Sequence, residues 1–174
     1  KGLLKMACRM DDPVIFMEHK GLYRQGYAAT EEPDADYLLS FGKGRKVLEG
    51  DELTVITWGA MVQKSLEAVQ SLEIQTDSVE VIDLRTLNPL DMDLIETSIM
   101  KTSKALVVHE DNITNGPGAE IAAIIADKFF ELLDGPVRRV GAKDSPVPFN
   151  WIIEEEILPQ TVDVANAIQE LLEY

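Results

Sequence analysis

Histidine is the side chain best suited to acid–base chemistry near neutral pH, and the chain has two, His19 and His109. Each closes a short apolar run, which is where sites gather in α/β folds. Because Glu110 and Asp111 follow His109, one interpretation is a general acid or base. The other, and the more common, is a hydrogen-bonded loop or interface histidine. No nucleophile accompanies either, since there is no G-x-S-x-G elbow and the single cysteine, Cys8, lies in a predicted helix.

Two further positions have residue types that bind anions. Arg85 follows the apolar run VIDL, where a guanidinium either holds a carboxylate or phosphate by paired hydrogen bonds or forms a salt bridge that fixes the loop. The turn Asn115–Gly118 precedes a predicted helix, and a glycine-rich turn at a helix N-terminus can bind an anion. It has neither Walker nor G-x-G-x-x-G spacing, so a tight strand-to-helix turn explains its glycines more simply.

The sequence has no spacing typical of a transition-metal site, because it contains neither C-x-x-C nor H-x-x-x-H. A hard cation held by carbonyl oxygens would leave little trace in the sequence. The polar residues are therefore scattered positions and not a catalytic set. This pattern argues against an enzyme that acts alone.

Composition limits the class of protein and its partners. A length of 174 residues fits one domain, or one domain with part of another, and the missing initial methionine suggests a piece of a longer chain. Sixteen basic and 31 acidic residues give a charge of −15, which excludes nucleic acid and favours either a basic partner or simple solubility. The acids Glu154–Glu156, Glu170 and Glu173 are most simply a solvated face. We expect no membrane span, no secretory signal and a reducing cytoplasm, given the lone cysteine.

Hydrophobic spacing predicts an alternation of strands and helices after residue 50. Strands are predicted at Leu53–Trp58, Val79–Leu84, Ala105–His109 and Pro136–Gly141. Helices are predicted at Met61–Leu72, Leu90–Met100, Ala119–Leu133 (with Ile121, Ile124, Ile125, Phe129 and Leu132 inward) and Thr161–Leu172. Such alternation indicates an α/β fold with right-handed crossovers and a largely parallel sheet covered on both faces.

The first part of the chain follows a different pattern. Residues Gly2–Met10 have helical spacing, and Pro13–Met17 (PVIFM) is predicted to be a short apolar strand. From Gly21 to Gly44 glycine, proline and acidic residues recur, which indicates an extended linker.

Several blocks together resemble the beta subunit of thiamine-diphosphate-dependent 2-oxo acid dehydrogenases. These blocks are DPVIFMEHKGLYR, LTVITWGAMVQKSLEAV, VIDLRTLNPLDMDLI, ALVVHEDNITNGPGAEIA and VRRVGAKDSPVPF. Parts of the third and fourth blocks, VIDLRTLNPLD and HEDN…GPGAEI, are also similar to transketolase and deoxyxylulose phosphate synthase. The resemblance implies that residues 1–30 are the tail of a pyrimidine-binding domain, 31–37 a linker and 38–174 a transketolase C-terminal domain. That domain is a three-layer α/β/α unit whose five-stranded, mostly parallel sheet has one antiparallel strand.

The resemblance also implies an enzyme activity for which other parts of the enzyme, outside this chain, supply the cofactor-binding residues. The family decarboxylates a 2-oxo acid on thiamine diphosphate and reductively acylates a lipoyl group. Its cofactor-activating glutamate lies upstream of this segment, and its magnesium and pyrophosphate motif lies in the alpha subunit or alpha portion. Gly50–Glu52 does not match that motif. We therefore expect thiamine diphosphate and magnesium to bind outside this chain, no cofactor-binding or complete catalytic set within it, and no activity from it alone.

Some site residues are implied position by position. Relatives bind a structural potassium ion, and the matching ligands are the carbonyls of Ala7, Cys8 and Met10 and the side chain of Asp12. Arg85 matches an arginine that lies near the substrate phosphate in the synthase. A 2-oxo acid has no phosphate, which favours a loop or interface role here.

The two polar residues at the end of the ALVVH strand differ in how widely the family shares them. His109 is not shared by all relatives, whereas Glu110 matches more of them. Arg85, His109 and Glu110 are therefore candidates near the site or an interface and are not an assigned catalytic set.

The implied partners are an alpha subunit or fused alpha portion, a second beta portion in a dimer, and the basic binding domain of a dihydrolipoyl acyltransferase.

The residues Leu22–Arg24 look more like branched-chain enzymes, which favours 2-oxoisovalerate-type substrates and branched-chain amino acid degradation. A pyruvate or acetoin dehydrogenase, and a non-catalytic docking module, are the alternatives. The expected location is the bacterial cytoplasm, or the mitochondrial matrix in a eukaryote.

Overall fold

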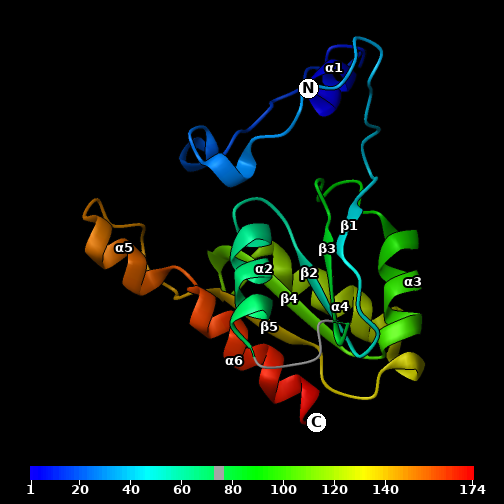
Figure 1. Cartoon of the computed structure of the whole chain (residues 1–174), viewed down its shortest axis with the longest axis vertical. Helices are drawn as coiled ribbons and strands as arrows, with labels where there is room; N and C mark the ends of the chain where they lie inside the picture. Colours follow the sequence, from blue (N-terminus) through cyan, green and yellow to red (C-terminus); the bar gives the residue numbers. More distant parts are fainter. Residues whose placement is uncertain (73–76) are drawn as a thin grey trace.

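A five-stranded sheet in the order β1-β3-β2-β4-β5 is the centre of the structure, a computed structural model that describes residues 1–72 and 77–174 (Figure 1). The strands are β1 (Arg45–Leu48), β2 (Leu53–Thr57), β3 (Val79–Asp83), β4 (Ala105–Asn112) and β5 (Arg138–Ala142). The helices are α1 (Gly2–Ala7), α2 (Met61–Ser71), α3 (Met92–Thr102), α4 (Pro117–Lys128), α5 (Trp151–Ile157) and α6 (Thr161–Leu172). Short 3-10 helices lie at Lys20–Leu22 (η1), Gly26–Ala28 (η2) and Phe130–Leu132 (η3).

The sheet is mixed, as the family resemblance implied. Strands β2, β3, β4 and β5 run parallel, whereas β1 pairs antiparallel with β3, with Arg45 opposite Asp83. Periodicity alone did not reveal β1, because it is a four-residue edge strand with no fully buried residue. We call the edge at which β2, β3 and β4 end the carboxyl edge.

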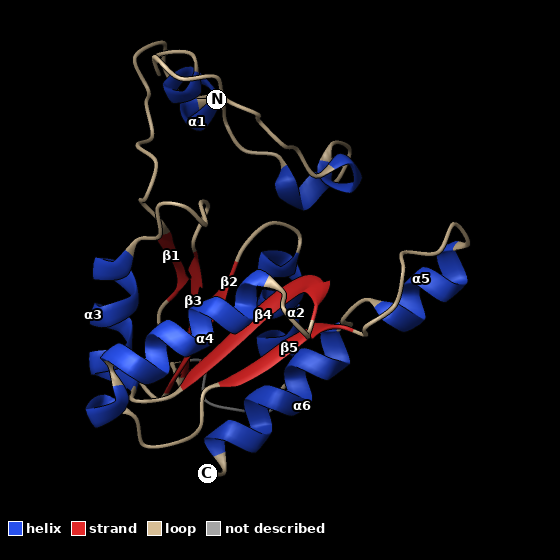
Figure 2. Cartoon of the chain, turned by 180° about the vertical axis from the view of Figure 1, so that it is seen from behind, coloured by secondary structure: helices blue, strands red, loops and turns tan. Residues whose placement is uncertain are grey.

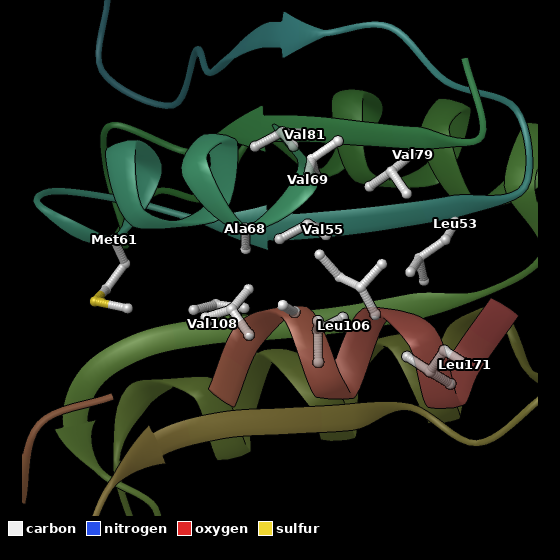
Figure 3. Packing of buried hydrophobic residues seen from close by; sticks show 13 residues of the cluster. Leu53, Val55, Met61, Ala68, Val69, Val79, Val81, Leu106, Val108 and Leu171 are labelled. Atoms are coloured by element: carbon white, nitrogen blue, oxygen red, sulfur yellow. The ribbon is translucent and has the colours of Figure 1, made fainter. Parts of the chain in front are cut away.

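Two separate cores make the three layers. On one face, α2 and α6 pack on Leu53, Val55 and other valines and leucines of the sheet (Figure 3). On the other face, α3 and α4 pack on a second cluster that includes Ile56, Ile82 and Val107. Figure 2 shows the helices on both sides of the strands. The predicted α/β/α arrangement is confirmed, and every residue of strands β2 and β3 is buried, as expected for a sheet covered on both faces.

The opposite, amino edge of the sheet contains a buried charge. Glu80 of β3 has no exposed surface and forms ion pairs with Lys46 (3.0 Å) and Lys101. The exposed Glu49 joins both lysines. Both lysines also reach solvent, so the buried carboxylate is neutralised without burying the cations fully.

Two predicted elements differ from the structure, and one observed helix was not predicted. Pro13–Met17 is not a strand, because no other strand among the described residues pairs with it. The helix predicted at Ala119–Leu133 ends at Lys128, and the chain continues as η3, so that Leu132 is exposed and not inward. Helix α5 was not predicted, because its apolar residues are consecutive and show no helical periodicity.

The remaining predicted helices and strands are present with bounds shifted by a few residues. The helix predicted at Gly2–Met10 is the shorter α1. Between residues 29 and 44 the chain has neither helix nor strand. Among the described helices, none is long and apolar enough to cross a membrane.

Candidate functional site

The carboxyl edge contains a stacked pair of aromatic rings. Trp58 follows β2 and His109 lies in β4, and their ring centroids are 5.6 Å apart with an angle of 7° between the planes. Strands β3 and β4 lie on opposite sides of β2, so the crossovers that leave β2 and β3 run in opposite directions. In open α/β sheets this switch point is where ligands usually bind.

His109 is enclosed by glycines from the loop before α4, from the first turn of α4 and from strand β5. A Cβ atom added to Gly116 would lie 2.9 Å from its Cε1 atom, and one added to Gly141 would lie 3.1 Å from its Nε2 atom. A Cβ on Gly118, in the first turn of α4, would overlap the ring itself. The histidine therefore explains Gly118, and the backbone carbonyl of Asn112 together with the histidine explains Gly116. The sequence alone did not indicate these contacts.

Burial decides the charge of this histidine. His109 has no exposed surface, and neither ring nitrogen makes a hydrogen bond to a described residue. Burial lowers its pKa, and Arg139 acts in the same direction, while Asp111 opposes them. The imidazole is accordingly neutral at pH 7 and closed off from solvent, which is the environment of a positioning residue and not of an acid–base catalyst.

Glu110 connects the carboxyl edge to the first part of the chain. Its Oε1 atom lies 3.2 Å from Nε2 of His19, and both side chains are more than one-third exposed. The two histidines of the sequence therefore lie near the same edge, one buried beneath a loop and one in an exposed ion pair. Residues 1–39 extend beyond this edge (Figure 1).

Arg85 lies apart from His109. It follows β3, which is separated from β4 by β2, and it has a left-handed backbone with φ of 58°. Its N–H donates to Oδ1 of Asp83 (3.1 Å), whose Oδ2 lies 3.3 Å from Nε of Arg45. Arg85 thus closes a turn fixed by Asp83, and the structure does not bring it together with His109 and Glu110 into one catalytic set.

A cleft that sequence reasoning missed lies between the first part of the chain and the sheet domain. It has a volume of about 520 Å³. Leu22, Tyr27 and Ala28 form one wall, and Arg45, Val47 and α2 form the other. Its walls are mainly apolar, and its one acid, Asp83, is paired with Arg45.

The residues matched to a potassium site follow one another at the end of α1. The carbonyl of Ala7 accepts a hydrogen bond from the N–H of Met10 (3.2 Å). Cys8, Met10 and Asp12 are exposed, so these residues do not enclose an ion by themselves. A potassium site at Ala7, Cys8, Met10 and Asp12 remains a prediction that needs ligands from elsewhere.

The described residues also do not fit a thiamine diphosphate and magnesium site. Within residues 1–72 and 77–174, no three histidines, cysteines or acids are placed to hold a metal ion. The Trp58–His109 stack lies at the switch point, and the His109 ring packs directly against Gly116 and Gly118 at the start of α4. No catalytic step is therefore derived through that cofactor on this chain.

Fold and site together define a three-layer α/β domain with a stacked Trp58–His109 pair at the carboxyl edge of its sheet. Residues 42–164 match the family model of the transketolase C-terminal domain, and the chain belongs to that family.

The chain is also similar to longer proteins. It is 40% identical over all 174 residues to the pyruvate dehydrogenase E1 component subunit beta of Staphylococcus aureus, and equally to that of Staphylococcus epidermidis. It spans about half of these relatives, 53% of their length. A solved structure described as a split gene transketolase, inactive beta4 tetramer, matches with a TM-score of 0.67 and 27% identity over 83% of this chain and 46% of the other.

Proposed function

We propose that this chain is the C-terminal part of the beta subunit of the decarboxylating component of a 2-oxo acid dehydrogenase complex. The observation that carries the proposal is the extent of the similarity. The family domain covers residues 42–164, whereas the similarity to pyruvate dehydrogenase beta subunits continues through residues 1–41. A domain shared by many enzymes would not explain a match to that first segment.

In this proposal residues 1–30 are the end of an upstream pyrimidine-binding domain and 31–37 link it to the sheet domain. The exposed apolar run Pro13–Met17 supports the division, because Ile15 is 90% and Met17 89% exposed. Consecutive apolar residues are typical of a strand buried on both faces. The rest of its sheet would come from the upstream half of the subunit.

Thiamine diphosphate would act as the electron sink for decarboxylation and would be held, with magnesium, by the upstream half and the alpha portion. The role of this chain is to bind and orient. The ion pair between His19 and Glu110 holds the upstream segment against the carboxyl edge. The neutral His109 holds the Gly116–Gly118 turn next to that ion pair.

The substrate is a short 2-oxo acid, and two observations favour different members of that class. Leu22–Arg24 favours a branched acid such as 2-oxoisovalerate, whereas the relatives at 40% identity are named for pyruvate. In the structure Tyr23 and Arg24 are exposed and Leu22 lines the cleft, so these residues are at an interface and not in a substrate pocket.

The test is to assemble the full-length beta subunit with its alpha portion and measure lipoyl acylation with pyruvate and with 2-oxoisovalerate. The expected result is activity only in the assembled enzyme with thiamine diphosphate and magnesium, and none from residues 1–174 alone. A preference for pyruvate would overturn the branched-chain assignment. Activity with neither acid would overturn the dehydrogenase function.

A second function, docking of a basic domain of the dihydrolipoyl acyltransferase, is favoured by a groove of about 550 Å³ near the C-terminus. Phe130 (74% exposed), Leu133, Pro136 and Tyr174 give it apolar walls. The acids around it include Asp127, Glu131, Asp134 and Glu173, all exposed. An apolar centre with an acidic rim is complementary to an apolar surface with a basic rim.

Calorimetry of the assembled enzyme with the acyltransferase binding domain at low and high salt tests this docking. We expect binding that weakens as salt rises, and at least roughly tenfold weaker binding for Phe130→Ala. Binding that is unchanged in Phe130→Ala and Asp134→Asn would place the docking surface elsewhere.

A further inference from the structure

Residues 144–157, which we call the arm, project from the sheet domain and consist of a loop followed by α5 (Figures 1 and 2). The arm has an unusual concentration of exposed apolar side chains. Phe149 is fully exposed, Trp151 is 65% exposed, and the exposed set also includes Val147, Ile152 and Ile153. A cluster of this kind on a monomer marks an interaction surface.

The base of the arm is fixed while its tip is free of the rest of the described chain. Asp144 accepts hydrogen bonds from the hydroxyl (2.6 Å) and the N–H (3.1 Å) of Thr114, and these bonds lower its pKa. The N–H of Lys143 donates to the carbonyl of Ile157 (3.1 Å), and the Gln160 side chain donates to the carbonyl of Glu155 (2.8 Å). A seven-residue helix is not stable alone, so this base holds α5 in a defined direction.

The cleft beside η1 and η2 offers apolar wall residues that could contact the exposed apolar side chains of the arm. Leu22, Tyr27, Val47, Val62 and Leu66 form the apolar part of its walls, and the charged side chains Arg45, Lys46 and Asp83 line the rest. In Figure 1 the arm and the η1–η2 segment project to the same side of the molecule, and Figure 2 agrees from behind.

The cleft side and the arm side of the chain also differ in charge. Residues 1–46 contain eight of the 16 basic residues and seven of the 31 acidic ones, so all of the net negative charge lies in residues 47–174. Exposed Lys20 and Arg24 flank Leu22 at the cleft, and exposed Glu155 and Glu156 lie in the arm. The arm therefore combines an apolar tip with acids, and the cleft combines apolar walls with bases.

We propose that two copies of this chain exchange arms, with the apolar tip of each arm filling the cleft of the other copy. This inference rests on the proposed function, because the family resemblance implies a second beta portion in a dimer, and it names the contact between the two copies. A twofold axis makes such an exchange reciprocal, so one pair of complementary surfaces is used twice. Trp151 and Phe149 are the buried anchors of the contact, and Lys20 and Arg24 face Glu155 and Glu156 across it.

Tryptophan fluorescence tests the contact directly, because the chain has two tryptophans, Trp58 and Trp151. In a Trp58→Phe background, the emission of Trp151 should shift to the blue and its quenching by acrylamide should fall as the full chain is concentrated. Sedimentation should show the dimer over the same concentrations. A dimer in which Trp151 remains fully accessible to quencher overturns the inference, and so does a chain that stays monomeric.

Substitutions separate this contact from other surfaces. Trp151→Glu should weaken the dimer by roughly tenfold or more, whereas Met100→Glu, an exposed apolar position on α3, should not. Glu155→Lys with Glu156→Lys should weaken it, and so should Lys20→Glu with Arg24→Glu. Combining all four should restore it.

Failure of the four-fold combination to restore the dimer, or a dimer unaffected by Trp151→Glu, would place the contact elsewhere. Neither result would touch the proposed function, which is tested by the activity of the assembled enzyme.

Discussion

Glu80 and His109 are both titratable, both fully buried and both in the central strands, yet the protein accommodates them in opposite ways. At the amino edge Oε2 of Glu80 lies against the ammonium groups of two lysines, Lys46 and Lys101. At the carboxyl edge His109 has no hydrogen-bond partner among the described residues, and burial lowers its pKa, so it stays neutral. A buried charge needs partners, whereas a neutral ring needs a matching shape, and the glycines around His109 provide that shape.

Removing the Glu80 carboxylate should have the largest effect. Glu80→Ala leaves a cavity and two lysines without their buried partner, and we expect it to cost about 3 kcal/mol in the free energy of unfolding. Urea denaturation followed by circular dichroism measures the change. Glu49→Ala is the matched control, because its exposed carboxylate contacts the same lysines and should contribute less than about 1 kcal/mol. Equal losses in the two variants would show that burial of Glu80 is not the cause.

Gly118→Ala should have the next largest effect. In an ordinary helix this change stabilises by about 0.5–1 kcal/mol, but here the new methyl group overlaps the His109 ring, and overpacking costs about 1–3 kcal/mol. Gly26→Ala is the control, because a Cβ there meets nothing within 4 Å. The loss at Gly118 should shrink in a His109→Ala background, and additive losses would contradict the contact.

The dependence of the free energy of unfolding on pH, below pH 7, tests whether His109 is neutral in the folded protein. Because its folded pKa is lowered, the unfolded chain binds the proton more readily. The contribution of His109 is therefore fully present above about pH 6.5 and is lost as pH falls through the folded pKa. His109→Phe, which cannot take up a proton, should lose less stability between pH 7 and 5.5 than the unmodified protein. Identical pH slopes would mean that His109 is not the titrating group.

The central strands and helices of the fold could be predicted from the sequence, whereas two peripheral elements could not. The strands β2, β3 and β4 are rich in apolar and β-branched residues, and the helices between them are periodic, so the parallel α/β arrangement followed from local pattern. Strand β1 and helix α5 did not follow, since one is an edge strand and the other an exposed arm, and neither has a pattern imposed by a core.

The site was harder to predict than the fold. His109 and Glu110 were identified from their place at a strand end, but the sequence does not show that one is buried under Gly118 and the other is paired with His19. The cleft and the groove near Tyr174 are formed by residues that are distant in the sequence, so no local pattern marks them. The run Pro13–Met17 was predicted to be a strand because it is short and apolar. A strand also needs a second strand to pair with, and no described strand pairs with this run.

The exposed counterpart of these buried groups, the ion pair between His19 and Glu110, should have the smallest effect. Its atoms are 3.2 Å apart, but both side chains are more than one-third exposed, so water and salt screen the interaction. A double-mutant cycle with His19→Gln and Glu110→Gln should give a coupling of about 0.5 kcal/mol or less at low salt, and none at high salt. A coupling that persists at high salt would show that the pair is shielded in solution. Because residues 1–39 extend over this edge, such shielding would mean that the segment is held there by more than this pair.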